Sequence, residues 1–217
     1  MTNSWEKYVD RYWVDTHVGE TVVVMGNGAS LKDVPIELLH KYPTFGTNHI
    51  YVLPFQPTYY VCVDELLLDT YPHKIYDVVA QSNIAFLSDY FSNSMMPSTW
   101  RLYQLPNVVR YDEYTQWFPG EAWVAGGTVT YVALKMAYGM GFDTVLLVGC
   151  DRDKEWNHFS DDYPALGDRN QRILDGQEYH LRLVGEAYKK DGRRIINLSP
   201  PSALDEFYER GSIEEYL

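Results

Sequence analysis

Cysteine, positive charge and long apolar runs are all scarce in this sequence. The two cysteines, Cys62 and Cys150, lie in apolar runs, which predicts two buried thiols rather than a disulfide or a metal site. No stretch approaches the roughly 18 consecutive apolar residues of a membrane span, and the first residues lack the apolar core of a signal peptide. We therefore expect a cytoplasmic protein with no membrane span.

Positive charge is outweighed by negative charge. Lysine and arginine total 18 against 30 aspartates and glutamates, which gives a formal charge of −12. Nucleic acid and anionic membranes repel such a surface, so neither is an expected partner. A small anionic ligand is compatible only where local groups reverse the field. Aromatic residues are plentiful, with 19 tyrosines, and the length suits a single domain over residues 1–217.

Short apolar runs alternate with helix-like segments along the chain. Strands are predicted at residues 21–26, 44–48, 57–65, 83–88, 144–151 and 193–199, and helices at 30–42, 128–141 and 178–192. Continuous apolar runs are typical of strands that are buried on both faces. This alternation predicts an α/β fold with a doubly wound, mostly parallel, Rossmann-like sheet. The loop-rich segments 89–123 and 152–176 are candidate lids, and the aromatic stretch 100–123 also fits the face of a homo-oligomer.

In a doubly wound sheet, ligands bind beyond the carboxyl ends of the strands. The residues expected at this edge are small or polar, although the strands before them are apolar. The candidates for contacting a ligand there are Gly26, Asn27, Gly28, Ser30, Asn48, Asp64, Gly126, Gly127, Thr128, Asp151, Asp153 and the turn 199–202.

The glycine loop GNGAS (26–30) leaves the first strand, with Ser30 as a candidate helix N-cap. It lacks the P-loop signature, and Leu31 stands where the dinucleotide fingerprint has its third glycine. Two interpretations of this loop stay open. Its backbone N–H groups surround a phosphate, or its glycines are needed only because the turn is tight. Asn48 follows the next predicted strand. Its side-chain amide is suited to hydrogen-bond a ribose hydroxyl or the edge of a base, or it bonds to the backbone of its own turn.

Three further motifs also have two interpretations each. Gly126, Gly127 and Thr128 precede a predicted helix. They form either an anion-binding site at its amino end or a simple N-cap. Asp151 and Asp153 have the spacing of a Mg²⁺ site, although single matches of this kind are frequent. His158 has carboxylates nearby in sequence and suits a general base or a bridge between surface acids.

Several of these segments occur in a familiar order. The stretches GNGASL, FGTNHIY, PTYYVCVDE, GGTVTYVALKMAYGMGFDTVLLVGCD, NHFSDDY and GRRIINLSPPSAL together resemble the DUF115 family, which includes archaeal 6-hydroxymethylpterin diphosphokinases. They also resemble the bacterial CMP-sialic-acid-dependent sialyltransferases. The resemblance spans about residues 20–207.

The resemblance implies a role for each matching segment. Asn27, Gly28 and Ser30 would contact the phosphates or ribose of a nucleotide, and Asn48 its ribose or base. Gly126, Gly127 and Thr128 would line the phosphate or sugar pocket, and His158 would be the catalytic base. One departure is Ala29, which replaces a proline that relatives usually carry.

The preferred hypothesis is a glycosyltransferase that binds a nucleotide-activated donor, a CMP-sugar, and transfers the sugar to a hydroxyl of a glycan or small alcohol. An alternative is a Mg²⁺-dependent diphosphokinase that uses ATP, with Asp151 and Asp153 as metal ligands and Asp151 in the catalytic machinery. A third hypothesis is a non-catalytic protein that binds a nucleotide or a glycan.

Overall fold

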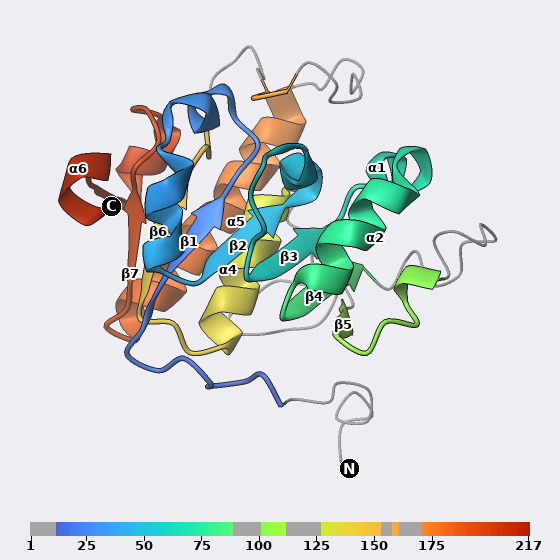
Figure 1. Ribbon diagram of the computed structural model, residues 1–217. Coiled ribbons are helices and arrows are strands. Elements are labelled where there is room, and N and C mark those ends of the chain that lie inside the picture. Colours follow the sequence, from blue (N-terminus) through green and yellow to red (C-terminus); the bar gives the residue numbers. More distant parts are fainter. Residues whose placement is uncertain (1–11, 89–100, 112–126, 153–157, 161–170) are drawn as a thin grey trace.

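Within the residues that the structure describes, an eight-stranded sheet forms the centre of the molecule (Figure 1). The computed structural model describes residues 12–88, 101–111, 127–152, 158–160 and 171–217. The strands are β1 (Thr21–Met25), β2 (Thr44–Thr47), β3 (Tyr59–Cys62), β4 (Ile84–Ser88), β5 (Val108–Tyr111), β6 (Thr144–Val148), β7 (Arg194–Asn197) and β8 (Glu209–Arg210). Their spatial order is β5-β4-β3-β2-β1-β6-β7-β8, and each described pairing is parallel. The predicted doubly wound, Rossmann-like α/β fold is confirmed.

Helices cover both faces of the sheet (Figure 1). One face packs against α4 (Val129–Gly139), α5 (Gln171–Lys190) and the 3-10 helix η6 (Ala203–Glu206). The other face packs against α1 (Glu65–Thr70), α2 (Pro72–Gln81), α6 (Ile213–Tyr216) and the 3-10 helices η2 (Ala29–Asp33), η3 (Ile36–Lys41) and η4 (Asn48–Val52). No helix within the described ranges is both long and apolar enough to cross a membrane.

Alternate residues of each central strand enter opposite layers of the core. In β1, Val22 and Val24 face the α4 and α5 layer, whereas Val23 and Met25 face the layer that holds Leu31. All four of these β1 side chains are fully buried. The continuous apolar run therefore reflects burial on both faces, as predicted for a parallel sheet.

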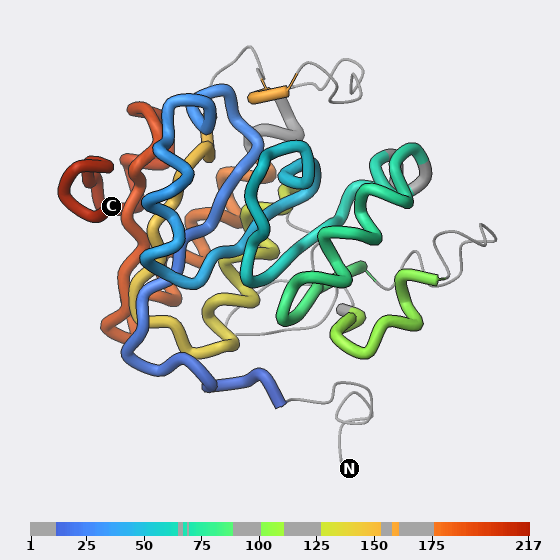
Figure 2. Tube along the Cα trace, viewed as in Figure 1, coloured from blue at the N-terminus to red at the C-terminus, as the bar shows by residue number. Residues whose placement is uncertain are grey.

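The winding of the chain reverses beside β1. From β1 the chain proceeds through β2 to β5 on one side, and then crosses to β6, β7 and β8 on the other. Val24 of β1 pairs with Phe45 of β2 and with Leu147 of β6. The carboxyl ends of β1 and β6 therefore form the switch point of the sheet, where ligands of doubly wound proteins bind. Figure 2 shows the segments after β1 (blue) and β6 (gold) running side by side at this edge.

Several predicted elements need correction. The single helix expected at 30–42 is wrong: η2 and η3 replace it, because Pro35 forces Val34 into an extended conformation (φ −81°, ψ 124°). The strands β5 and β8 and the helices α1, α2 and α6 were not predicted. Helix α5 begins at Gln171, inside the segment expected to be irregular up to residue 176.

Candidate functional site

The loops after β1 and β6 are bonded directly to each other at the switch point. The backbone N–H of Gly26 donates to Val148 O (2.8 Å), and that of Gly28 donates to Gly149 O (2.7 Å). A Cβ atom on Gly26 would overlap the Gly149 carbonyl oxygen, and one on Gly28 would lie 2.5 Å from Asp151 Cγ. Close approach of the two loops therefore accounts for both glycines.

Asp151 holds the start of η2 in place through hydrogen bonds. Its carboxylate accepts hydrogen bonds from the Ser30 backbone N–H (2.8 Å) and from the Ser30 hydroxyl. The expectation that Ser30 caps the helix is wrong, because Gly28 occupies the N-cap position and the Ser30 side chain turns to Asp151 instead. Both carboxylate oxygens of Asp151 are thus engaged by the loop after β1.

The described residues contain no cluster of three or more histidine, cysteine, aspartate or glutamate side chains that could hold a metal ion. Asp153, the expected partner of Asp151 in a Mg²⁺ site, lies outside the described residues, and so does Gly126. Asp151 itself is occupied as an anchor for Ser30.

Asn27 joins the loop after β1 to the loop after β2. Its amide nitrogen donates to the carbonyl oxygen (2.9 Å) and the hydroxyl oxygen (2.7 Å) of Thr47, and its amide oxygen accepts from the His49 N–H (2.9 Å). The side chain is buried, so these bonds are shielded from water. Asn27 therefore fixes the relative position of the two loops.

Asn48 joins the ends of β2 and β3, and Asp64 bonds to the start of the helix that follows β3. Asn48 adopts a left-handed backbone conformation (φ 44°), which asparagine tolerates better than most residues. Its amide oxygen accepts from the Val63 N–H (3.2 Å), and its carbonyl oxygen accepts from the Tyr60 hydroxyl (2.6 Å). The carboxylate of Asp64 accepts from the Leu67 N–H (3.4 Å) at the start of α1.

His158 lies against the glycine loop. It forms an antiparallel bridge with Gly28, and its Nδ1 lies 3.2 Å from the carbonyl oxygen of Asn27. The N–H of Phe159 donates to the same carbonyl oxygen (3.1 Å). A carbonyl oxygen can only accept, so this contact is a hydrogen bond when the proton is on Nδ1, and a neutral ring of that tautomer has its lone pair on Nε2. This tautomer is the one a general base needs when Nε2 faces its substrate.

A side-chain relay connects the loop after β6 to the start of α4. The Nη1 of Arg152 donates to the Gln177 side-chain oxygen (2.6 Å), and the Gln177 amide donates to the carbonyl oxygen of Gly127. Gly127 has a left-handed backbone (φ 64°), and Thr128 occupies the N-cap position of α4 without a side-chain cap bond. Burial lowers the pKa of Arg152, and the nearby carboxylate of Glu178 opposes this shift.

Sequence reasoning placed Arg152 at the carboxyl edge of the sheet, within 149–153, but gave it no role, and it missed Gln177. Arg152 directly follows the predicted candidate Asp151, so its position beyond a buried strand was a usable signal. Gln177 gave no signal, because its contact with Arg152 depends on how α5 packs beside α4.

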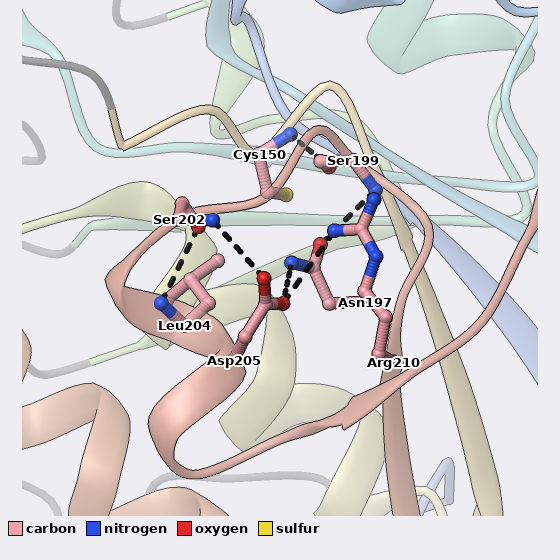
Figure 3. A network of polar contacts seen from close by, with 7 residues as sticks. All are labelled: Cys150, Asn197, Ser199, Ser202, Leu204, Asp205 and Arg210. Carbon is pink, nitrogen blue, oxygen red and sulfur yellow. Dashed lines mark hydrogen bonds and ion pairs between the residues drawn. The ribbon is translucent and has the colours of Figure 1, made fainter.

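A second polar network supports the loop after β6 from the side of β7 (Figure 3). The Ser199 hydroxyl oxygen accepts from the Cys150 N–H (2.9 Å), and the Ser199 N–H donates to the Asn197 amide oxygen (3.0 Å). The Asn197 amide nitrogen donates to Asp205 (2.7 Å), which also accepts from the Ser202 N–H (3.1 Å). The turn 199–202 thus lies at the expected edge and braces the Cys150 backbone.

Asn197→Ala is expected to lower the free energy of unfolding by about 2–4 kcal/mol, because it removes a bond to a buried N–H and a bond to a carboxylate. The Asn197 side chain is fully buried, so water cannot replace these partners. Urea denaturation would measure the change. The exposed Asn83 is the matched control, and Asn83→Ala should change the free energy by less than about 0.5 kcal/mol. Equal effects for the two variants would contradict the bracing role.

Cys62 and Cys150 are buried and free, as predicted. Burial raises the pKa of each thiol to about 12. Neither thiol forms a significant amount of thiolate at neutral pH, so neither is suited to nucleophilic chemistry.

Comparison with known proteins gives a likeness of fold. No protein-family model matches the chain, and no curated protein matches it either. A solved structure of the sialyltransferase CstII from Campylobacter jejuni with cytidine-5′-monophosphate (CMP) is similar, with a TM-score of 0.58 and 17% identity over 90% of this chain and 86% of that one. A CstII variant in complex with CMP gives a TM-score of 0.55 and 18% identity over 87% and 85% of the two chains. At these identities the likeness shows that this chain shares the fold of these sialyltransferases.

Proposed function

We propose that this chain is a glycosyltransferase that binds a CMP-linked sugar at the switch point of the sheet and transfers the sugar to an acceptor hydroxyl. The observation that carries the proposal is the placement of His158, whose ring is held against the glycine loop with Nδ1 next to the Asn27 carbonyl oxygen. The fold shared with two CMP-bound sialyltransferase structures supports the choice of nucleotide.

In the proposed reaction, Nε2 of His158 takes the proton of the acceptor hydroxyl. The hydroxyl oxygen then attacks the anomeric carbon of the sugar, a new C–O bond forms, and the bond from that carbon to the phosphate oxygen breaks. CMP leaves with the electron pair of the broken bond. Proton transfer by a positioned histidine contributes about 10²- to 10⁴-fold to rates of this kind.

The other candidate ligand contacts belong to the framework of the proposed site. Asn27 and Asp151 hold the loops after β1, β2 and β6 in place through their side chains. Asn48 and Asp64 lie at the next two strand ends, where the ribose and base would bind. Gly127 and Thr128 would lie beside the phosphate at the start of α4.

CMP is expected to stabilise the chain against heat. At a concentration about 100 times Kd, a ligand that binds only the folded state adds about 2.7 kcal/mol. For a chain of this size, that raises Tm by about 5–10 °C. The measurement is a thermal-shift assay with CMP, UDP, GDP and ATP, each with and without Mg²⁺. Stabilisation by ATP with Mg²⁺, and none by CMP, would replace this proposal with the diphosphokinase.

Turnover separates the transferase from a non-catalytic nucleotide-binding protein. If CMP binds, the chain is incubated with CMP-sialic acid and a panel of glycan acceptors, and released CMP is measured. CMP release that depends on the acceptor supports transfer. Binding of CMP without any release across the panel would favour the non-catalytic alternative.

A further inference from the structure

The hydrogen-bond donors of Gly26, Gly28 and Ser30 in the glycine loop already have partners within the protein. The backbone N–H groups of Gly26 and Gly28 donate to carbonyl oxygens of the β6 strand end. The N–H and hydroxyl of Ser30 donate to the Asp151 carboxylate, so an anionic group of the chain itself occupies the position where this loop would receive an anion. A ligand phosphate therefore needs a different partner at the switch point.

Arg152 is the residue beside this contact that carries the opposite charge. Its guanidinium is held by Gln177, whose side chain is only 2% exposed and also contacts Gly127 at the entry to α4. The side chain of Gln177 packs close to Gly127. A Cβ atom placed on Gly127 would lie only 3.2 Å from Gln177 Cγ. Gln177 thus anchors Arg152, which is partly shielded from water.

The electrostatic setting favours a role in anion recognition. The chain has a formal charge of −12, so an anionic ligand is repelled unless a local cation reverses the field. Burial lowers the pKa of Arg152, but an arginine keeps its proton in proteins. A guanidinium presents several N–H groups in a rigid fork that matches phosphate oxygens. Partial burial strengthens such a contact, because water screens it less.

We propose that Arg152 recognises the phosphate of the donor nucleotide and that Gln177 is the residue that positions it. This inference rests on the proposed function, because it assigns the phosphate contact within the same site. Arg152 would distinguish a nucleotide from its nucleoside, and the glycine loop would shape the site without binding the phosphate.

The test compares CMP with cytidine, which has the same base and ribose but no phosphate. Arg152→Gln is expected to weaken CMP binding by about 10- to 100-fold in calorimetry, the range of a hydrogen bond to a charged group. Cytidine affinity should change by less than about twofold, because it lacks the group that Arg152 contacts. Gln177→Ala should weaken CMP binding less than Arg152→Gln does, since the cation remains but loses its anchor.

Arg182→Gln is the matched control. Arg182 lies on α5 and pairs at the surface with Glu206 (3.6 Å), so its replacement should leave both affinities unchanged. Salt gives an independent readout, because raising ionic strength should weaken CMP binding by the wild type and by Arg152→Lys more than by the uncharged Arg152→Gln. If Arg152→Gln does not fold, Arg152→Lys replaces it in the CMP and cytidine comparison. Lysine keeps the positive charge but loses the planar guanidinium that can bind two phosphate oxygens.

Each outcome has a distinct meaning. Loss of CMP affinity with cytidine affinity retained supports the inference. Equal losses for CMP and cytidine, or no loss for either, would overturn the role of Arg152 while leaving the proposed function intact. Failure of the wild-type chain to bind CMP at all would instead remove the proposed function, and this inference with it.

Discussion

His158→Asn is expected to lower the turnover of a CMP-sugar by about 10²- to 10⁴-fold, the contribution typical of a general base. Asparagine can still donate a hydrogen bond from its side chain to the Asn27 carbonyl oxygen, as Nδ1 does in the wild type. The contact with the glycine loop is therefore preserved, and the basic nitrogen is lost. CMP affinity should stay within about twofold, because the change acts on the acceptor side of the reaction.

The measurement is steady-state CMP release, combined with calorimetry for CMP on the same preparations. His40→Asn is the matched control, because His40 is exposed on η3 before the amino end of β2 and packs at a tilt of 36° against Phe55 (4.9 Å between ring centroids). It should leave turnover unchanged. Full activity in His158→Asn would show that another group accepts the proton.

Gly26→Ala is expected to lower the free energy of unfolding by about 3 kcal/mol, near the upper end for overpacking in a rigid core. The added methyl group would overlap the carbonyl oxygen of Gly149 and lie 2.9 Å from Cys150 Sγ. Neither strand can retreat easily, because Met25 and Val148 are paired in the sheet immediately before these loops. Urea denaturation would measure the loss.

Gly176→Ala is the matched control for the same chemical change. Gly176 lies in α5 with open space around it, and alanine favours a helix by about 0.5–1 kcal/mol over glycine. The two substitutions should therefore change stability in opposite directions. A loss below about 1 kcal/mol for Gly26→Ala would mean that the loops after β1 and β6 do not pack as described.

The framework of the fold was predictable because burial leaves a signal within each segment. The runs at β1 and β6 are continuously apolar, which is typical of strands covered on both faces. Helix α4 was predicted from its spacing and from the glycines that flank it. By contrast, β8 has only two residues, which is too short to leave a pattern, and it exists because β7 pairs with it.

The arrangement of the site was predictable only in part. Position beyond a strand end singled out Asn27, Asn48, Asp64 and Asp151, and the structure places all four at the carboxyl edge of the sheet. Their partners could not be inferred. The bond between Ser30 and Asp151 joins residues far apart in the sequence, and no local pattern records such a contact. The same holds for Arg152 and Gln177, whose contact depends on the packing of α5.

The central position of β1 has a consequence for how the chain folds. One edge of β1 pairs with β2, which follows it closely, but the other edge pairs with β6, as in Val23 with Leu146. During synthesis, the second edge of β1 has no partner until Thr144–Val148 leaves the ribosome, so an apolar strand edge is exposed to other chains in the meantime. Closing so long a loop also carries a large cost in chain entropy before the contact stabilises anything. The switch point that forms the candidate site therefore cannot assemble before Thr144–Val148 has been synthesised, although β2 to β5 are complete earlier.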